Sequence, residues 1–281
     1  MKQILIFFVA TLLISGCQNP LVKNPEKTQS SQQAPLGSYI AQSQDYSVAQ
    51  TALVIGNSEY QYQPLPNPIN DANDMANSLK KLGFNVTLKM NLDRQGMDEA
   101  IREFERRLSN TPEDDVGIFY FSGHGAQVNG QNFLIPIDNR QIKSEAELRQ
   151  HAIHATKISE MMKVANAGMN IITLDACRDN PYQGSEKTLT RGLARMPPTQ
   201  RSSTVIAFAT APGKTASDEG PDGRHGVYTY YLLEALEKSH STRIDQVFSE
   251  VRDVVKDQTH QEPWLQMSLR QQCYFGGKCR Q

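Results

Sequence analysis

The chain has 281 residues, 38% of them hydrophobic, and its 29 Lys and Arg residues nearly balance 30 Asp and Glu residues, which leaves a formal net charge of −1. The basic residues are dispersed along the chain, so neither composition nor charge patterning indicates a nucleic-acid-binding surface. We therefore expect a globular domain that has no nucleic-acid partner.

The first residues are typical of an export signal. Lys2 is followed by an apolar run over residues 4–14, which is too short to cross a bilayer but suits the core of a signal peptide. The two small residues directly before Cys17 resemble the bacterial lipoprotein signal. This resemblance implies a signal peptide over residues 1–16 and lipidation of Cys17, and two acyl chains suffice for stable membrane anchoring. An ordinary secretory signal with a chance Cys is the alternative.

Residues 17–49 are rich in Gln, Ser, Asn, Pro and Lys. Such a composition cannot bury enough apolar surface to offset the entropy lost on ordering. We expect a lipid-anchored flexible tether over this range and one folded domain over residues 50–281. Gln18 and Asn19 resemble the sorting pattern of outer-membrane lipoproteins, so the expected location is the cell envelope, on the outer membrane facing the periplasm.

Two further cysteines lie near the end of the chain. Cys273 and Cys279 flank a turn-like Phe-Gly-Gly-Lys sequence, and an exported protein can form disulfides. We expect these two residues to be bridged, the alternative being two free thiols on a loose tail.

Hydrophobic periodicity predicts alternating strands and helices between residues 50 and 281. Apolar runs predict strands over 51–56, 84–90, 118–124, 171–177, 204–209 and 272–275, with a short extended piece over 133–136. Apolar residues at helical spacing predict helices over 71–82, 95–108, 158–167, 228–237 and 244–255. The alternation implies an α/β fold, a mostly parallel sheet of about six strands with helices on both faces.

Two of the predicted strands end in reactive side chains, His124 and Cys177. If these strands are neighbours, the two side chains emerge together at the carboxyl edge of the sheet, where ligands gather. A thiol is mostly protonated near neutral pH, and an adjacent imidazole can take its proton. Glycines on both sides of His124 favour a sharp turn and close approach of a substrate. The backbone N–H groups of Gly125 and Cys177 are candidate oxyanion donors.

The chain resembles the caspase superfamily, most closely its bacterial metacaspase-like and paracaspase-like members. The resemblance lies in Ala52–Asn57, Tyr120–Gly125, Leu174–Pro181, Arg191–Ala194, Ala207–Gly213 and Gln261–Trp264. It implies the caspase–hemoglobinase three-layer fold, His124 as base, Cys177 as nucleophile, and endopeptidase activity on protein or peptide substrates. No cofactor or metal is expected; some metacaspases depend on calcium, but the sequence does not indicate such a requirement.

One departure from true caspases concerns specificity. Asp175 replaces a Gln two residues before the nucleophile, and its carboxylate would repel the acidic P1 residue that true caspases accept. In metacaspases and paracaspases, which resemble this chain here, that Asp forms an acidic S1 pocket with a second Asp, matched by Asp71, and in paracaspases with a third acid, matched by Asp218. The resemblance implies Arg, then Lys, at P1, because guanidinium groups bind carboxylates bidentately. The alternatives are a helix N-terminal acid for Asp71 and a solvated loop acid for Asp218.

The sequence thus predicts a membrane-tethered cysteine endopeptidase that cleaves after basic residues. The alternative is a lipoprotein that uses the caspase fold as a binding or assembly module, with vestigial chemistry. Pseudoenzymes commonly lose the His, the Cys or the pocket acids, and this chain retains all of them. A loop over 184–201 with basic residues at 187, 191, 195 and 201 is either a self-processing site or a solvated basic loop.

Overall fold

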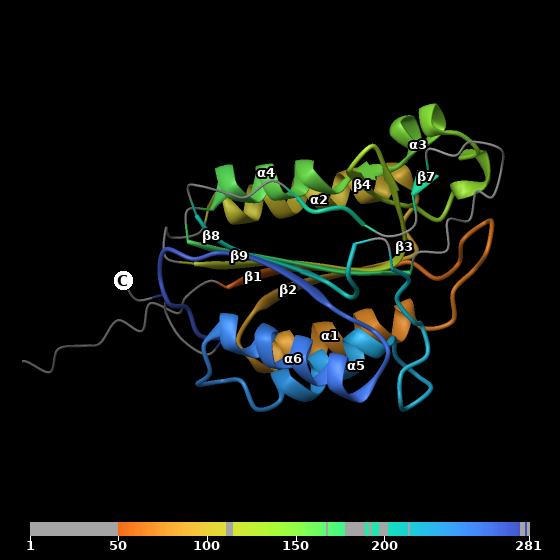
Figure 1. Cartoon of the computed structure of the whole chain (residues 1–281). Helices are drawn as coiled ribbons and strands as arrows, with labels where there is room; N and C mark the ends of the chain where they lie inside the picture. The colour runs from red at the N-terminus through yellow and green to blue at the C-terminus, as the bar shows by residue number, and fades with distance from the viewer. Residues whose placement is uncertain are drawn as a thin grey trace, which may run out of the picture. The chain divides into compact units, whose positions relative to one another are not determined.

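A sheet of mostly parallel strands lies between two layers of helices (Figure 1). The computed structural model describes residues 50–110, 115–166, 168–177, 189–190, 193–196, 202–212, 214–275 and 279. These residues belong to one compact unit. The predicted signal, Cys17 and the predicted tether lie outside the described residues.

The central strands follow the order β2-β1-β3-β6-β8-β9. They are β1 (Thr51–Gly56), β2 (Asn85–Met90), β3 (Val116–Val128), β6 (Met169–Cys177), β8 (Ser203–Phe208) and β9 (Trp264–Ser268). All neighbours pair in parallel except β8 and β9, which are antiparallel. The predicted fold class, a mostly parallel three-layer α/β sandwich, is confirmed.

Helices cover both faces of this sheet, as Figure 1 shows. One face carries α1 (Pro68–Lys81), α5 (Val227–Leu236) and α6 (Ile244–Gln258), and the other carries α2 (Arg94–Leu108) and α4 (Ala155–Ala165). Strand side chains alternate between the two layers: Val54 and Tyr120 pack with the first set, and Ile55 and Phe121 with the second. Because both faces are covered, the strands are continuous apolar runs. Successive side chains of each strand point to opposite faces, so alternate residues belong to two separate cores.

Local sequence explains where α1 and α2 begin. α1 starts at Pro68, earlier than predicted, because proline is well suited to the first helical position. α2 begins after Asp93, whose side chain accepts a hydrogen bond of 2.7 Å from the N–H of Gly96. α4 also begins earlier than predicted, at Ala155. The short helix α3 (Glu145–His151) was not predicted.

The prediction that a strand ends at His124 is wrong, because β3 continues to Val128. From Gly125 onward β3 pairs antiparallel with β4 (Gln131–Leu134), which in turn pairs with β5 (Ile153–His154). A two-residue strand, β7 (Leu189–Thr190), also pairs with this extension.

The glycines around His124 serve close packing rather than a turn. A Cβ atom on Gly123 would lie 2.4 Å from the hydroxyl of Tyr60, and one on Gly125 would lie 2.9 Å from the Cβ of Ala176. Both contacts are shorter than side chains tolerate, so these positions require glycine for the extended strand to fit between its neighbours.

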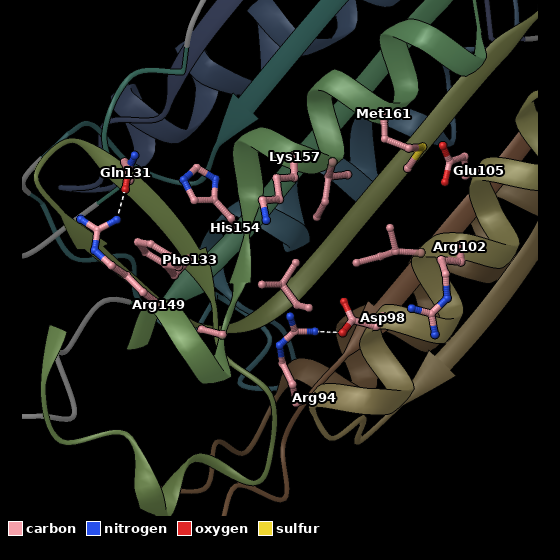
Figure 2. A pocket seen from close by; sticks show the side chains of 14 residues that line it. Arg94, Asp98, Arg102, Glu105, Gln131, Phe133, Arg149, His154, Lys157 and Met161 are labelled. Atoms are coloured by element: carbon pink, nitrogen blue, oxygen red, sulfur yellow. Dashed lines mark hydrogen bonds and ion pairs between the residues drawn. The ribbon is translucent and has the colours of Figure 1, made fainter. Parts of the chain in front are cut away.

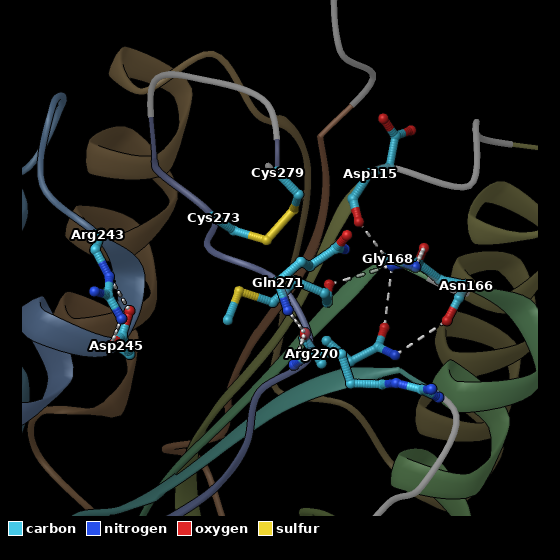
Figure 3. Close-up of a disulfide and its surroundings, with 12 residues drawn as sticks. Asp115, Asn166, Gly168, Arg243, Asp245, Arg270, Gln271, Cys273 and Cys279 are labelled. Atoms are coloured by element: carbon cyan, nitrogen blue, oxygen red, sulfur yellow. Dashed lines mark hydrogen bonds and ion pairs between the residues drawn. A yellow bond between two sulfur atoms is a disulfide. The ribbon is translucent and has the colours of Figure 1, made fainter. Parts of the chain in front are cut away.

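The last strand of the sheet also differs from the prediction. It is β9, whereas Tyr274 forms only an isolated bridge with Arg243. Cys273 and Phe275 are buried in the core beside α6 instead of pairing on the sheet. The half-buried edge strand β9 lacks a continuous apolar run, which is why the pattern did not indicate it. A disulfide joins Cys273 and Cys279 (Figure 3).

Among the described residues, no helix combines the length and the apolar character that a membrane crossing requires.

Candidate active site

The parallel ladder between β3 and β6 ends with His124 paired to Cys177. The two strands are neighbours, which is the condition on which the prediction from the sequence depended, and the two residues occupy the same level at the carboxyl edge of the parallel sheet. The side chain of Cys177 lies outside the described residues, and its backbone is placed by this register.

The imidazole of His124 is buried and oriented by a backbone carbonyl. Its Nε2 lies 2.6 Å from the carbonyl oxygen of Gln63, in the segment between β1 and α1. A carbonyl can only accept a hydrogen bond, so Nε2 carries the proton and Nδ1 is the basic nitrogen. Sequence reasoning missed Gln63, since a main-chain oxygen leaves no signal in residue type.

Tyr60 supports the same histidine. Its ring centroid lies 4.4 Å from that of His124. Its hydroxyl accepts a hydrogen bond of 2.7 Å from the His124 N–H and donates one of 3.1 Å to the carbonyl of Ile135. Tyr60 therefore joins β3 to the end of β4 and limits the movement of the imidazole.

The N–H of Gly125 points toward the edge of β3 along which β6 ends. The carbonyl of Ser122 accepts from Asn57 on the β1 side, and the carbonyl of His124 accepts from Ile135 on the β4 side, each at 3.0 Å. Successive residues of a strand direct their polar groups to alternate edges. Gly125 therefore directs its N–H to the opposite edge from these two, which is the edge of Cys177.

Two carboxylates are buried beneath the first turn of α5. Asp71 accepts hydrogen bonds from the Ser122 hydroxyl at 2.8 Å and from the Gly226 N–H at 3.1 Å. Asp175 accepts from the N–H of Thr229 at 3.2 Å and from its hydroxyl at 2.6 Å. The start of α5 thus supplies N–H donors to both acids, where the helix dipole favours negative charge. Asp71 lies in the first turn of α1, but its hydrogen-bond donors, Ser122 and Gly226, belong to β3 and to the start of α5.

Asp218, between β8 and α5, interacts with the other two acids. Burial, followed by the charge of Asp175, raises the pKa of Asp71 to about 8, and Asp218 contributes to this rise. Burial and the charge of Asp175 likewise raise the pKa of Asp218 to about 7. The backbone of Asp218 is held by the side-chain amide of Asn67, which donates to its carbonyl. The structure therefore brings the three predicted acids into one electrostatic cluster, in which burial and mutual repulsion favour the protonated forms of Asp71 and Asp218.

A docked segment, residues 193–196, supports the Gly125 region. The side-chain amide of Asn132 donates to the Ala194 carbonyl at 2.8 Å and accepts from the Ala194 N–H at 2.5 Å. Leu193 is buried, and its Cδ2 lies 3.4 Å from the place where Gly125 would carry a Cβ. Asn132 therefore holds Leu193 against Gly125, a role that its sequence context did not indicate.

The other end of this docked segment is held by β9. The side-chain amide of Gln266 donates to the Met196 carbonyl at 2.7 Å and accepts from the Met196 N–H at 2.8 Å. The guanidinium of Arg195 lies 4.5 Å from the ring centroid of Trp264. The other basic residues of the predicted processing loop, at 187, 191 and 201, lie outside the described residues.

Comparisons with known proteins bear on the family to which the chain belongs. A family profile described as a caspase domain matches residues 49–274. The human mucosa-associated lymphoid tissue lymphoma translocation protein 1 is 27% identical over 202 residues, which is 70% of this chain and 23% of the human protein. Its mouse homologue has the same identity and coverage. The chain thus spans less than a quarter of the length of these curated relatives.

Proposed function

Because the chain belongs to the caspase family of cysteine-type peptidases, we propose that it is an endopeptidase with His124 as general base and Cys177 as nucleophile. The observation that carries this proposal is the register that ends the β3–β6 ladder at His124 and Cys177. It is supported by the Gln63 carbonyl, which leaves Nδ1 of His124 as the proton acceptor.

The reaction follows from these positions. The Cys177 thiol transfers its proton to Nδ1 of His124, and the thiolate sulfur attacks the carbonyl carbon of the scissile peptide bond. The N–H groups of Gly125 and Cys177 donate to the resulting oxyanion, and losing one such donor typically costs about 10²–10³ in rate. The imidazolium then protonates the leaving amine. Water, deprotonated by the same imidazole, hydrolyses the thioester and regenerates the thiol.

The acid cluster accounts for the choice of P1 residue in this proposal. Asp71, Asp175 and Asp218 form an S1 pocket that accepts Arg, then Lys. A guanidinium can engage two carboxylates at once, whereas an ammonium acts as a single compact charge. Truncating one partner of a buried charge pair costs roughly 2–5 kcal/mol, so we expect at least about 10²-fold discrimination against uncharged P1 residues.

The test uses the full chain purified in detergent, with fluorogenic peptides that end in Arg, Lys or Asp and differ only there. Cleavage after Arg and Lys that disappears in both Cys177→Ala and His124→Ala is the expected result. Cleavage after Asp would overturn the S1 assignment and leave the nucleophile in place. The dyad would be contradicted if two results occur together. These are the absence of cleavage of all three peptides and alkylation of the Cys177 thiol by a small reagent no faster than that of free cysteine.

The membrane attachment is a separate part of the proposal and is supported by the sequence alone. We expect residues 1–16 to be removed and Cys17 to carry acyl chains that anchor the domain in the cell envelope through residues 17–49. Labelling of growing cells with an alkyne fatty acid tests this: the wild-type chain should incorporate label, and Cys17→Ser should not. Unlabelled wild-type protein would contradict the anchor without affecting the peptidase proposal.

A further inference from the structure

A groove lies between α2 and α4 and is closed at one end by β4, β5 and α3 (Figure 2). α2 and α4 cover the face of the sheet opposite to α1 and α5, which carry Asp71 and the donors to the acid cluster. A ligand in this groove would therefore not occupy the proposed S1 pocket.

The groove has an apolar floor. Ile101 from α2 and Met161 from α4 are partly buried against the core, and Ile153, Ile158 and Phe133 are almost completely buried between them. The exposed surface of Ile101 and Met161 suits an apolar side chain of a bound ligand, because covering it removes further apolar surface from water.

The rim of the groove is mostly basic. Arg94, Arg102, Arg149 and Lys157 line it, with Asp98 and Glu105 as the acids. Arg94 pairs with Asp98, and Arg149 pairs with Glu145 outside the groove. Within the described part of the chain, no ion pair involves Arg102 on α2 or Lys157 on α4. These two cations come from opposite walls of the groove (Figure 2).

Two observations concern the charge and the hydrogen bonding of the residues that line the groove. Burial, followed by the charges of Lys157 and Arg149, lowers the pKa of His154, and Glu160 opposes this effect, so the nearby cations outweigh the nearby acid at this imidazole. In addition, Nε of Arg94 and Nδ1 of His154 are buried and make no hydrogen bond to any described residue. Buried nitrogens of this kind are normally paired, so two side chains that line the groove have hydrogen-bonding capacity that no described residue meets.

We propose that the groove between α2 and α4 binds an acidic segment of a peptide chain. The carboxylates of the peptide contact Arg102 and Lys157, and one of its apolar side chains lies on the floor beside Ile101 and Met161. A peptide that alternates acidic and apolar residues fits better than a nucleic acid, because its apolar side chains match the apolar floor, whereas a continuous row of phosphates has no apolar group to place there. This binding site does not depend on the proposed cleavage chemistry.

The test measures fluorescence anisotropy of a labelled peptide, Glu-Leu-Glu-Glu-Leu-Glu, with the full Cys177→Ala chain in detergent. We expect saturable binding that weakens at least about tenfold between about 50 and 300 mM salt, as exposed charge pairs do. A peptide with Gln in place of every Glu should bind at least about tenfold more weakly, since it lacks the charges.

Charge-reversal variants locate the site. Arg102→Glu with Lys157→Glu should weaken peptide binding at least about tenfold, whereas Lys80→Glu with Lys81→Glu, at exposed positions on α1 across the sheet, should leave it unchanged. Circular dichroism and the melting temperature confirm that both pairs of variants are folded. Absence of binding, equal binding of the Gln peptide, or equal effects of the two pairs would overturn the proposal. Tighter binding of a single-stranded oligonucleotide would overturn the choice of a peptide.

Discussion

Asp71 and Asp175, 104 positions apart in the chain, both approach Gly226. A methyl group at this glycine would lie 3.1 Å from Oδ2 of Asp175 and 3.6 Å from Oδ2 of Asp71. Because Gly226 has no side chain, both carboxylates can pack closely against the start of α5. In the proposed peptidase the P1 guanidinium binds these carboxylates beside Gly226.

Gly226→Ala should therefore change P1 selectivity. The added methyl group reduces the space for a planar guanidinium more than for the slimmer ammonium of Lys, so kcat/KM for Arg substrates should fall at least about tenfold and the Arg/Lys ratio should fall with it. Steady-state kinetics with the paired Arg and Lys peptides measure this. The rate at which iodoacetamide alkylates Cys177 is the control and should not change. An unaltered Arg/Lys ratio would show that Gly226 does not border the P1 site.

Asp71 should make the stability of the protein depend on pH. Its pKa is raised from 3.8 to about 8 in the folded protein, so its contribution to stability is fully present below the unfolded pKa and is lost as pH rises through the folded pKa. The wild type should lose stability between about pH 4 and pH 9 relative to Asp71→Asn, by an amount on the order of a few kcal/mol. Thermal melts of both proteins across this range measure the difference. Parallel curves would contradict a proton held at Asp71.

Binding of a basic ligand should release protons. Asp71 and Asp218, with pKa values of about 8 and about 7, are both largely protonated near pH 6 in the ligand-free protein, and a guanidinium favours their charged forms. The affinity of the Cys177→Ala protein for an arginine peptide should therefore rise between about pH 6 and pH 8.5. Calorimetry in two buffers of different ionisation enthalpy counts the protons released. Asp218→Asn should reduce that number, and zero release by the Cys177→Ala parent would contradict the coupling.

Asn132 should act on catalysis through Gly125. Asn132→Leu leaves the N–H and carbonyl of Ala194 without their partners and releases Leu193 from Gly125, so kcat should fall about tenfold or more with little change in KM. Gln266→Leu is the matched control, because it removes the two equivalent hydrogen bonds to the N–H and carbonyl of Met196. Met196 lies farther from Gly125 along the segment. Both variants should lose about 1–3 kcal/mol of stability. Equal loss of kcat in the two would show that the effect is only structural.

Much of the fold follows from local pattern. The apolar run at 51–56 predicted β1 at its observed bounds, and the stripe of Met97, Phe104 and Leu108 predicted the buried face of α2. Errors came where the pattern is weak. The extension of β3 past His124 contains glycine and polar residues, and the edge strand β9 buries only part of its surface. In both cases pairing with a neighbouring strand, rather than hydrophobic alternation, determines the structure.

For the candidate site, residue type and position beside apolar runs of strand length were enough to select His124 and Cys177, whereas the three acids were selected through the resemblance to metacaspases and paracaspases. The supporting contacts could be assigned only from the folded chain. The Gln63 carbonyl that orients His124, the Gly226 N–H that contacts Asp71, and the Asn132 amide that holds Ala194 join segments far apart in sequence. Main-chain groups and side-chain amides occur throughout the chain and carry no signal of a special role. They contribute to the site only where tertiary packing brings them within hydrogen-bond distance of a site residue or of the segment that supports it.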